Sequence, residues 1–190
     1  MWSQIGVLRR PLKVALVLLA LVGPLVIMPS IANAYTFHGC KYDGTDPAIS
    51  YRYYSVGATY QTAFDQGQYA WDVTSVPGYF YSTTGSDPMI NVEDGSYSGS
   101  DWAVTSFGCD GDGTYTSNEV TVRMDIVDMA GLTAYEKKLV LIHELGHAYG
   151  LGHSGTGCAD PRVMSQGSTK FGCGGTPPWS NDQAGVNARY

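Results

Sequence analysis

The sequence predicts an α+β fold with several short strands, two long helices and a further helix at the C-terminal end. Short runs of β-branched and aromatic residues are separated by turns rich in Gly, Ser and Asp, which favours strands. Two longer stretches have apolar residues at helical spacing. The 190 residues show no internal repeat and no sign of a second folded domain, so we expect a single one.

The first 34 residues have the features of a secretory signal peptide. Three basic residues precede an apolar run at 14–28, which a Gly-Pro pair interrupts, and residues 32–34 form an A-x-A cleavage site. We therefore expect removal of residues 1–34 and secretion to the extracellular space. A permanent membrane anchor is disfavoured by the Gly-Pro break and the cleavage site. The pair Arg9-Arg10 is a weak indication of twin-arginine export, but ordinary secretion is favoured.

Cleavage after Ala34 leaves residues 35–190 as the folded domain. This part has eight basic and 17 acidic residues, and therefore a formal charge of −9 with neutral histidines. A negative charge of this size argues against nucleic acid or an anionic membrane as a partner. It also predicts a weak preference for cationic substrates. We expect a monomer that does not stay on the membrane.

All four cysteines follow the signal peptide, and an even number in an exported domain predicts two disulfides. Three pairings are possible, of which we favour Cys40–Cys109 with Cys158–Cys173. The second bond closes a loop of about 15 residues, which contributes about 3 kcal/mol in the chain-entropy model. A zinc site made of cysteines is the alternative, but no C-x-x-C pair supports it.

Strands and helices are expected to alternate along the first two thirds of the domain. Residues 58–73 have a helical apolar pattern, which Gly67 weakens. Residues 132–149 give the strongest helix, because Thr133 can cap it and Glu136 completes a capping box. Strands are expected at residues 49–56, 79–83, 89–92, 101–107 and 119–126.

The region after residue 153 is expected to be mostly loop. Its one short apolar segment is Val-Met-Ser at residues 163–165. Ser180 is expected to cap a last helix at 181–189, with Asp182 in its first turn, where a carboxylate favours the helix dipole.

Residues 143–153 read HELGHAYGLGH and contain three of the four histidines. His143 and His147 are four residues apart and share one helix face. Gly150 can take the left-handed backbone that ends a helix, so that His153 can return to the other two. Three neutral imidazoles with an open fourth position are the ligand set of a catalytic zinc. Glu144 is the expected general base; a helix with buried core histidines is the alternative, and the extended spacing disfavours it.

A second cation site is considered at residues 110–113, which read Asp-Gly-Asp-Gly, together with Glu119. Carboxylates and glycine turns suit Ca²⁺. The spacing differs from that of an EF-hand, however, and a solvated turn is the favoured interpretation.

The chain resembles the metzincin zinc proteases, and within them the matrixins (the matrix-metalloprotease type). The string HELGHAYGLGHS at 143–154 has the matrixin form, with a serine after the third histidine. Met164 stands where the methionine of the Met-turn is expected, beneath the metal and not bound to it. At the C-terminal end, Asp182, Gly185 and Tyr190 resemble the closing helix of matrixins. The resemblance implies a twisted, mostly parallel sheet with one antiparallel edge strand.

The resemblance also implies a secreted zinc-dependent endopeptidase. Zinc would be held by His143, His147 and His153, and Glu144 would act as general base on a metal-activated water. The protein or peptide substrate would lie along the strand near residues 102–107.

The chain also departs from the matrixin pattern. The span between the third histidine and Met164 is longer and contains Cys158, and no Pro follows Met164. His38 alone cannot hold the second, structural zinc of matrixins. No tyrosine follows two residues after Met164, so a tyrosine zinc ligand is not expected. No pro-region with a cysteine switch is expected either.

Two other functions are considered. The first is a catalytically silent secreted module that keeps the fold and binds zinc and a partner. The intact Glu144 disfavours it, because a binding module has no need of a general base. The second is an enzyme that acts on small peptides or other amides.

Overall fold

The computed structural model describes residues 35–155 and 157–190. The predicted signal peptide at 1–34 lies outside the described residues. Within the described ranges, no helix combines the length and the apolar composition that a membrane span needs.

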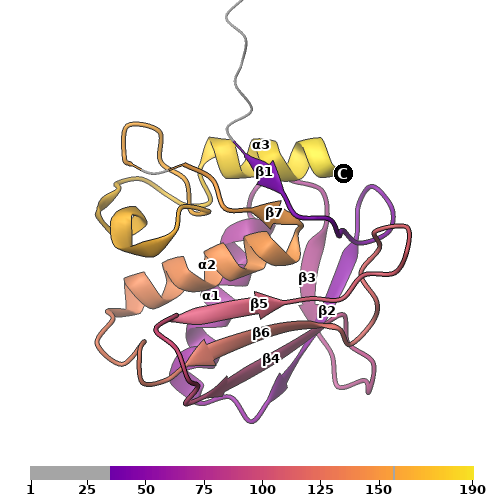
Figure 1. Ribbon diagram of the computed structural model, residues 1–190, viewed down its shortest axis with the longest axis horizontal. Coiled ribbons are helices and arrows are strands. Elements are labelled where there is room, and N and C mark those ends of the chain that lie inside the picture. Colours follow the sequence, from indigo (N-terminus) through magenta and orange to yellow (C-terminus); the bar gives the residue numbers. More distant parts are fainter. Residues whose placement is uncertain (1–34, 156) are drawn as a thin grey trace, which may run out of the picture. The chain divides into compact units, whose positions relative to one another are not determined.

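A five-stranded sheet forms one side of the core (Figure 1). Its strands run in the spatial order β3-β2-β4-β6-β5, of which the first four are parallel and β5 is an antiparallel edge strand. The mostly parallel sheet with one antiparallel edge is thereby confirmed. Each predicted strand is present, with ends that differ by three residues at most. The strands are β2 (Ala48–Tyr54), β3 (Tyr79–Ser82), β4 (Ile90–Gly95), β5 (Ala103–Ser106) and β6 (Val120–Asp125).

The two long helices are α1 (Ala58–Asp72) and α2 (Ala134–Ala148), and they pack against each other. At their contact a Cβ added to Gly67 would lie 3.0 Å from the Cβ of Leu141. The glycine that weakens the helical pattern of α1 therefore allows the close approach of α2. The indole Nε1 of Trp71 also donates a hydrogen bond of 2.9 Å to the carbonyl of Ile142.

The core lies between the sheet and these helices. Alternate residues of β4 and β6 are buried, as the period of two along a strand requires. The predicted apolar stripe of α2 is also fully buried, and each such side chain contributes about 1.5–3 kcal/mol. The fully buried residues from these elements include Phe64, Trp71, Ile90, Val92, Val120, Val122, Met124, Leu139, Ile142 and Leu145.

The predicted capping box of α2 is present. The amide of Glu136 donates to the hydroxyl of Thr133 at 3.2 Å, and the Glu136 carboxylate accepts from the Thr133 amide at 2.8 Å. A cap of this type contributes about 1 kcal/mol and fixes where α2 begins. Because the start of α2 is fixed, the helix face on which His143 and His147 lie is fixed as well.

Three short elements were not predicted. Strand β1 (Thr36–Phe37) pairs antiparallel with β7 (Leu151–Gly152), and a 3-10 helix, η1, spans Gly167–Gly172. Two-residue strands have no periodicity from which to predict them. Figure 1 shows the β1–β7 pair between α3 (Ser180–Arg189) and the end of α2.

The predicted cap of α3 was wrong by one residue. Ser180 is the first helical residue, and Trp179 takes the capping position. The reason is the carboxylate of Asp182, which accepts a hydrogen bond of 3.0 Å from the amide of Trp179. The side chain in the first turn thus supplies the cap that the sequence assigns to Ser180.

Both favoured disulfides are confirmed. Cys40 and Cys109 are bonded with Cα atoms 5.8 Å apart, and Cys158 and Cys173 with Cα atoms 5.0 Å apart. The first bond joins the segment after β1 to the loop after β5. The second joins the loop after His153 to the residue that follows η1, and so closes the region around Met164.

Candidate metal centre

The backbone at the end of α2 brings the three predicted histidines together. His143 and His147 lie one turn apart on α2, and Gly150 ends the helix with a φ of 92°. The amide of Gly150 donates to the carbonyl of His147 at 2.8 Å, and β7 then leads to His153. The hydroxyl of Thr36 in β1 donates to the carbonyl of His153 at 2.5 Å, which fixes this third histidine. The left-handed turn predicted at Gly150 is thus present.

The Nε2 atoms of the three rings converge on one point. The Nε2 of His147 is 3.1 Å from the Nε2 of His143 and 3.1 Å from the Nε2 of His153. A tetrahedral zinc with Zn–N bonds of about 2.0–2.1 Å separates its ligand nitrogens by about 3.3 Å. The spacing of the three nitrogens therefore fits a single ion between them.

The other ring nitrogens define the tautomers. The Nδ1 of His143 lies 2.6 Å from the carbonyl of Val163, and the Nδ1 of His147 lies 2.7 Å from the carbonyl of Leu151. A carbonyl only accepts hydrogen bonds, so both Nδ1 atoms carry the proton and both Nε2 atoms present a lone pair. Two lone pairs that face each other at 3.1 Å repel, and a cation between them removes that repulsion. The donor set therefore suits zinc.

Burial keeps these rings neutral. It lowers the pKa of His143 well below its usual value, and the neighbouring His147 and Lys170 lower it further. Desolvation also lowers the pKa of His147 and of His153. Neutral imidazole is the form that binds a metal, so the site is ready for one at neutral pH.

Glu144 is buried beside the ligands and faces β5. Its carboxylate Oε2 accepts a hydrogen bond of 2.7 Å from the hydroxyl of Thr105. Burial raises the pKa of Glu144 to about 7, and the hydrogen bond from Thr105 opposes that rise. A carboxylate with a pKa near neutrality suits a general base. Thr105 was not predicted, because a threonine in a short strand carries no sequence signal of contact with a distant helix.

Met164 packs beneath α2 close to the histidines. A Cβ added to Gly146 would overlap the sulfur of Met164, so the two segments are in direct contact. The carboxylate of Asp182 accepts hydrogen bonds from the amides of Val163 (2.9 Å) and Met164 (3.3 Å). Since the carbonyl of Val163 accepts from His143, α3 helps to orient a candidate ligand. This role of Asp182 was not predicted, and burial raises its pKa to about 6.

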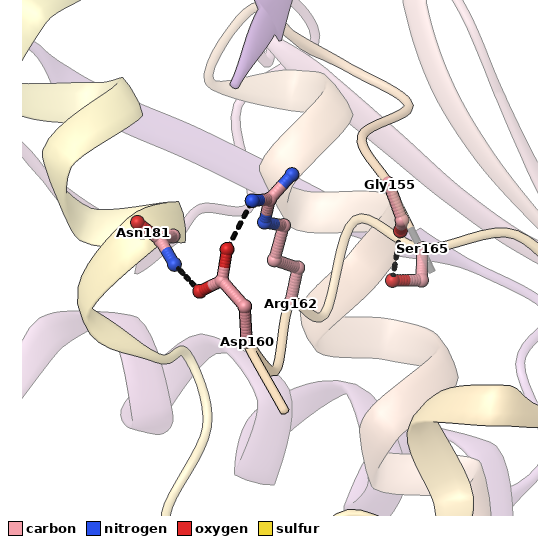
Figure 2. Close-up of polar contacts among 5 residues, drawn as sticks. All are labelled: Gly155, Asp160, Arg162, Ser165 and Asn181. Carbon is pink, nitrogen blue, oxygen red and sulfur yellow. Dashed lines mark hydrogen bonds and ion pairs between the residues drawn. The ribbon is translucent and has the colours of Figure 1, made fainter. Parts of the chain in front are cut away.

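The loop between His153 and Met164 is tied down by polar contacts (Figure 2). The carboxylate of Asp160 pairs with the guanidinium of Arg162 and accepts from the side-chain amide of Asn181 on α3. The hydroxyl of Ser165 donates to the carbonyl of Gly155 at 2.6 Å. The segment that is longer than in matrixins is therefore held against α3.

A cleft of about 530 Å³ opens above the three histidines and Glu144. Residues 102–105, at the start of β5, also line it, as do Gln166, Gly167 and Lys170 in and before η1. A water or a substrate can therefore reach the three histidines from the side of β5. A catalytic zinc needs such access, because its fourth coordination position is not taken by the protein.

His38 also lines the cleft and serves a different purpose. Its Nε2 donates to the carbonyl of His147 at 2.6 Å, and its ring stacks on Phe107 with centroids 4.0 Å apart. His38 therefore holds the last turn of α2. In the part of the chain that the structure describes, the only grouping of three or more potential metal ligands is His143, His147 and His153.

The calcium site is not supported. The carboxylates of Asp110 and Asp112 each accept a hydrogen bond from the amide of Thr114, at 2.9 and 3.0 Å. Glu119 lies against Gly108 instead. These carboxylates close their own turn, which agrees with the solvated turn that the sequence favours.

The chain matches no protein-family model and no curated protein sequence. Among solved structures it resembles myroilysin, with a TM-score of 0.47 and 20% identity over 63% of this chain and 54% of that one. It also resembles high choriolytic enzyme 1, a hatching enzyme zinc-protease of the medaka fish Oryzias latipes. In that case the TM-score is 0.40 and the identity 17%, over 60% of this chain and 50% of that one. The match spans about half the length of each structure, and likeness at this level does not by itself assign an activity.

Proposed function

We propose that the protein is a secreted zinc-dependent endopeptidase of the metzincin type, with its catalytic domain at residues 35–190. The observation that carries the proposal is the convergence of three imidazole nitrogens beside a buried glutamate in an open cleft. His143, His147 and His153 would hold the ion, and Glu144 would be the general base. The two disulfides agree with an exported protein.

Glu144 carries the proton transfers of the proposed reaction. A zinc ion held by the three histidines would supply Lewis-acid chemistry, which would polarise the substrate carbonyl and lower the pKa of a water. The Glu144 carboxylate takes a proton from the attacking water and passes it to the departing amine. Thr105 keeps this carboxylate in place through its hydroxyl. No serine or cysteine nucleophile is required.

The substrate is proposed to bind as an extended strand along β5. Among the described strands, β5 has β6 as its sole neighbour, so its other edge can accept main-chain hydrogen bonds. This edge borders the cleft and lies next to Glu144. The closer likeness to matrixins rests on Ser154, Met164 and the C-terminal helix, and it is part of the proposal.

The decisive experiment combines metal analysis of the secreted protein with hydrolysis of casein, with and without a chelator. We expect one zinc per chain and cleavage that the chelator abolishes and added zinc restores. Zinc without cleavage of casein or of a peptide library would favour a silent binding module. Cleavage of dipeptides alone would favour an enzyme for small amides. A chain without zinc would contradict the central proposal.

Glu144→Ala tests the mechanism. We expect kcat/KM to fall by at least about a hundredfold, because the proton acceptor is lost. The zinc content should stay at one per chain, because the three histidines remain. Full activity in this variant, measured on the same peptide, would refute the assignment of Glu144.

A further inference from the structure

A buried lysine is among the residues that line the cleft. Lys170, in η1, is 3% exposed and lines the cleft together with His143 and Glu144. Its ammonium group donates to the carbonyl of Ser165 at 2.7 Å and to the carbonyl of Gly167 at 2.9 Å. An ammonium group has three hydrogens, so one donor remains for a further partner.

Among the described residues, no carboxylate forms an ion pair with this ammonium group. The ion pairs of the described residues are Arg123–Glu93 and Arg162–Asp160, so no described carboxylate lies within 4.0 Å of the Lys170 ammonium. Burial lowers the pKa of Lys170 to about 8, and the charge of Glu144 opposes the fall. The two carbonyl oxygens that accept hydrogen bonds from the ammonium group favour its charged form. Buried charges are normally paired, because an unpaired one loses its hydration without compensation.

The surroundings of Lys170 suit a side chain that has both methylene groups and a negative end. Trp102 and Val140 line the same cleft with apolar surface. Trp102 also packs against Phe171, the residue after Lys170, with ring centroids 4.9 Å apart and the rings tilted by 32°. An acidic side chain could bury its methylene groups against this surface and place its carboxylate on the remaining ammonium hydrogen.

We infer that the cleft selects peptide substrates with Asp or Glu beside the cleaved bond, and that Lys170 is the specificity-determining residue. This inference rests on the proposed endopeptidase function. It is opposite in sign to the weak preference for cationic substrates that the net charge predicts. A contact ion pair in a desolvated cleft outweighs the field of distant surface charges, which salt screens.

A structural role for Lys170 makes a different prediction. If its ammonium group only ties Ser165 to Gly167, its loss weakens the loop and lowers the cleavage of all peptides alike. A specificity role instead changes the ratio between acidic and neutral peptides. The test therefore compares kcat/KM for an acidic peptide with kcat/KM for its neutral partner, and does not rely on the rate for one peptide.

The experiment uses the zinc-loaded mature protein and pairs of peptides that differ only by Glu against Gln, or Asp against Asn, at each position flanking the cleaved bond. Mass spectrometry identifies the bond. We expect the wild type to prefer one acidic position by about tenfold or more in kcat/KM. In Lys170→Gln the ratio should fall to about one, and in Lys170→Glu it should drop below one.

Lys137→Gln is the matched control. Lys137 is also a buried lysine, its ammonium group also donates to a backbone carbonyl, that of Leu132, and it does not line the cleft. Its substitution should lower the melting temperature without changing the peptide ratio. Equal cleavage of both members of every pair by the wild type, or an unchanged ratio in Lys170→Gln, would overturn the inference.

Binding separates this inference from the proposed function. In zinc-loaded Glu144→Ala, calorimetry should show tighter binding of the acidic peptide, and Glu144→Ala/Lys170→Gln should lose the difference. If the wild type cleaves no peptide but this difference is present, the endopeptidase proposal fails and the acidic subsite stands. If peptides are cleaved and the difference is absent, the endopeptidase stands and the subsite fails.

Discussion

Glu144 depends on its surroundings for its proposed chemistry. A glutamate in water would be a weak base at neutral pH, because its pKa lies near 4.3. Burial between α2 and β5 raises the pKa of Glu144 to about 7, and Thr105 limits the rise by donating to the carboxylate. The motif identifies the residue, but the neighbouring strand adjusts its basicity.

The pH dependence of activity follows from these shifts. Because the pKa of Glu144 is raised, its carboxylate is protonated as the pH falls through about 7, and the base form is lost. A bound cation favours the carboxylate, so the midpoint lies at or below about pH 7. The histidines, whose pKa values are lowered, take up protons and release the metal at lower pH. A profile of kcat/KM from pH 9 to pH 4, with zinc content at each point, tests this; a flat rate down to pH 4 would contradict it.

Thr105→Val should move this profile to higher pH. The substitution keeps the shape of the side chain but removes the hydrogen bond that favours the charged form of Glu144. The acid limb should shift up by about one pH unit. Thr105→Ser, which keeps the hydroxyl, is the control and should retain the wild-type profile. If Thr105→Val and Thr105→Ser gave the same profile, Thr105 would have no part in setting the pKa.

Helix α2 joins the core to the site. Its apolar residues are buried against the rest of the fold, while His143 and His147 face the cleft. Gly146 lies between these two histidines in sequence, where the helix contacts Met164. The same turn that contains Met164 carries the carbonyl that orients His143. A change in this packing is therefore transmitted to a candidate ligand.

Gly146→Ala tests that connection. The added methyl group would overlap the sulfur of Met164, and overpacking of this kind costs about 1–3 kcal/mol, more than the gain of about 1 kcal/mol in helix propensity. We expect a lower melting temperature and weaker zinc binding, measured by thermal unfolding and by competition with a chelator. Gly131→Ala is the control, because a Cβ at Gly131 has no atom within 4 Å. Wild-type zinc affinity in Gly146→Ala would refute the coupling.

At the scale of the whole molecule, the site is assembled from both ends of the domain. Strand β1 fixes β7 and His153, while Asp182 on α3 holds the turn that orients His143. The Cys158–Cys173 bond closes the loop region between them. Metal binding should consequently stabilise the entire fold and not α2 alone.

Zinc should raise the melting temperature of the metal-free protein. A ligand at a thousand times its Kd adds about 4 kcal/mol, which corresponds to about 10 °C for a domain of this size. Differential scanning calorimetry with increasing zinc measures the shift. Calcium should leave the melting temperature unchanged, because the carboxylates at 110–112 are engaged in their own turn. A calcium-dependent rise would show that a second cation site exists.

Much of the fold and of the candidate site was predictable from local pattern. The five strands, the two long helices and the box at Thr133 follow from side-chain periodicity and capping chemistry, which act over a few residues. The ligand string is local as well, because helix geometry puts His143 and His147 on one face and a left-handed glycine lets the chain turn back toward them. The prediction of the cysteine pairing used only the number of cysteines and their spacing along the chain. The cap of α3 was predicted at Ser180 but lies at Trp179. The reason is that the carboxylate of Asp182, in the first turn, accepts a hydrogen bond from the Trp179 amide.

By itself, the sequence determined the five strands of the sheet, the three α-helices and the three histidines that could hold a metal, and it favoured the cysteine pairing that is present. Only the tertiary structure decided what surrounds them: Thr105 on Glu144, Asp182 on the turn that orients His143, β1 beside β7 and Lys170 in the lining of the cleft. The physical reason is range. Periodicity and capping act between near neighbours, whereas a hydrogen bond to a buried carboxylate, or the burial of an unpaired charge, exists only after distant segments have packed together.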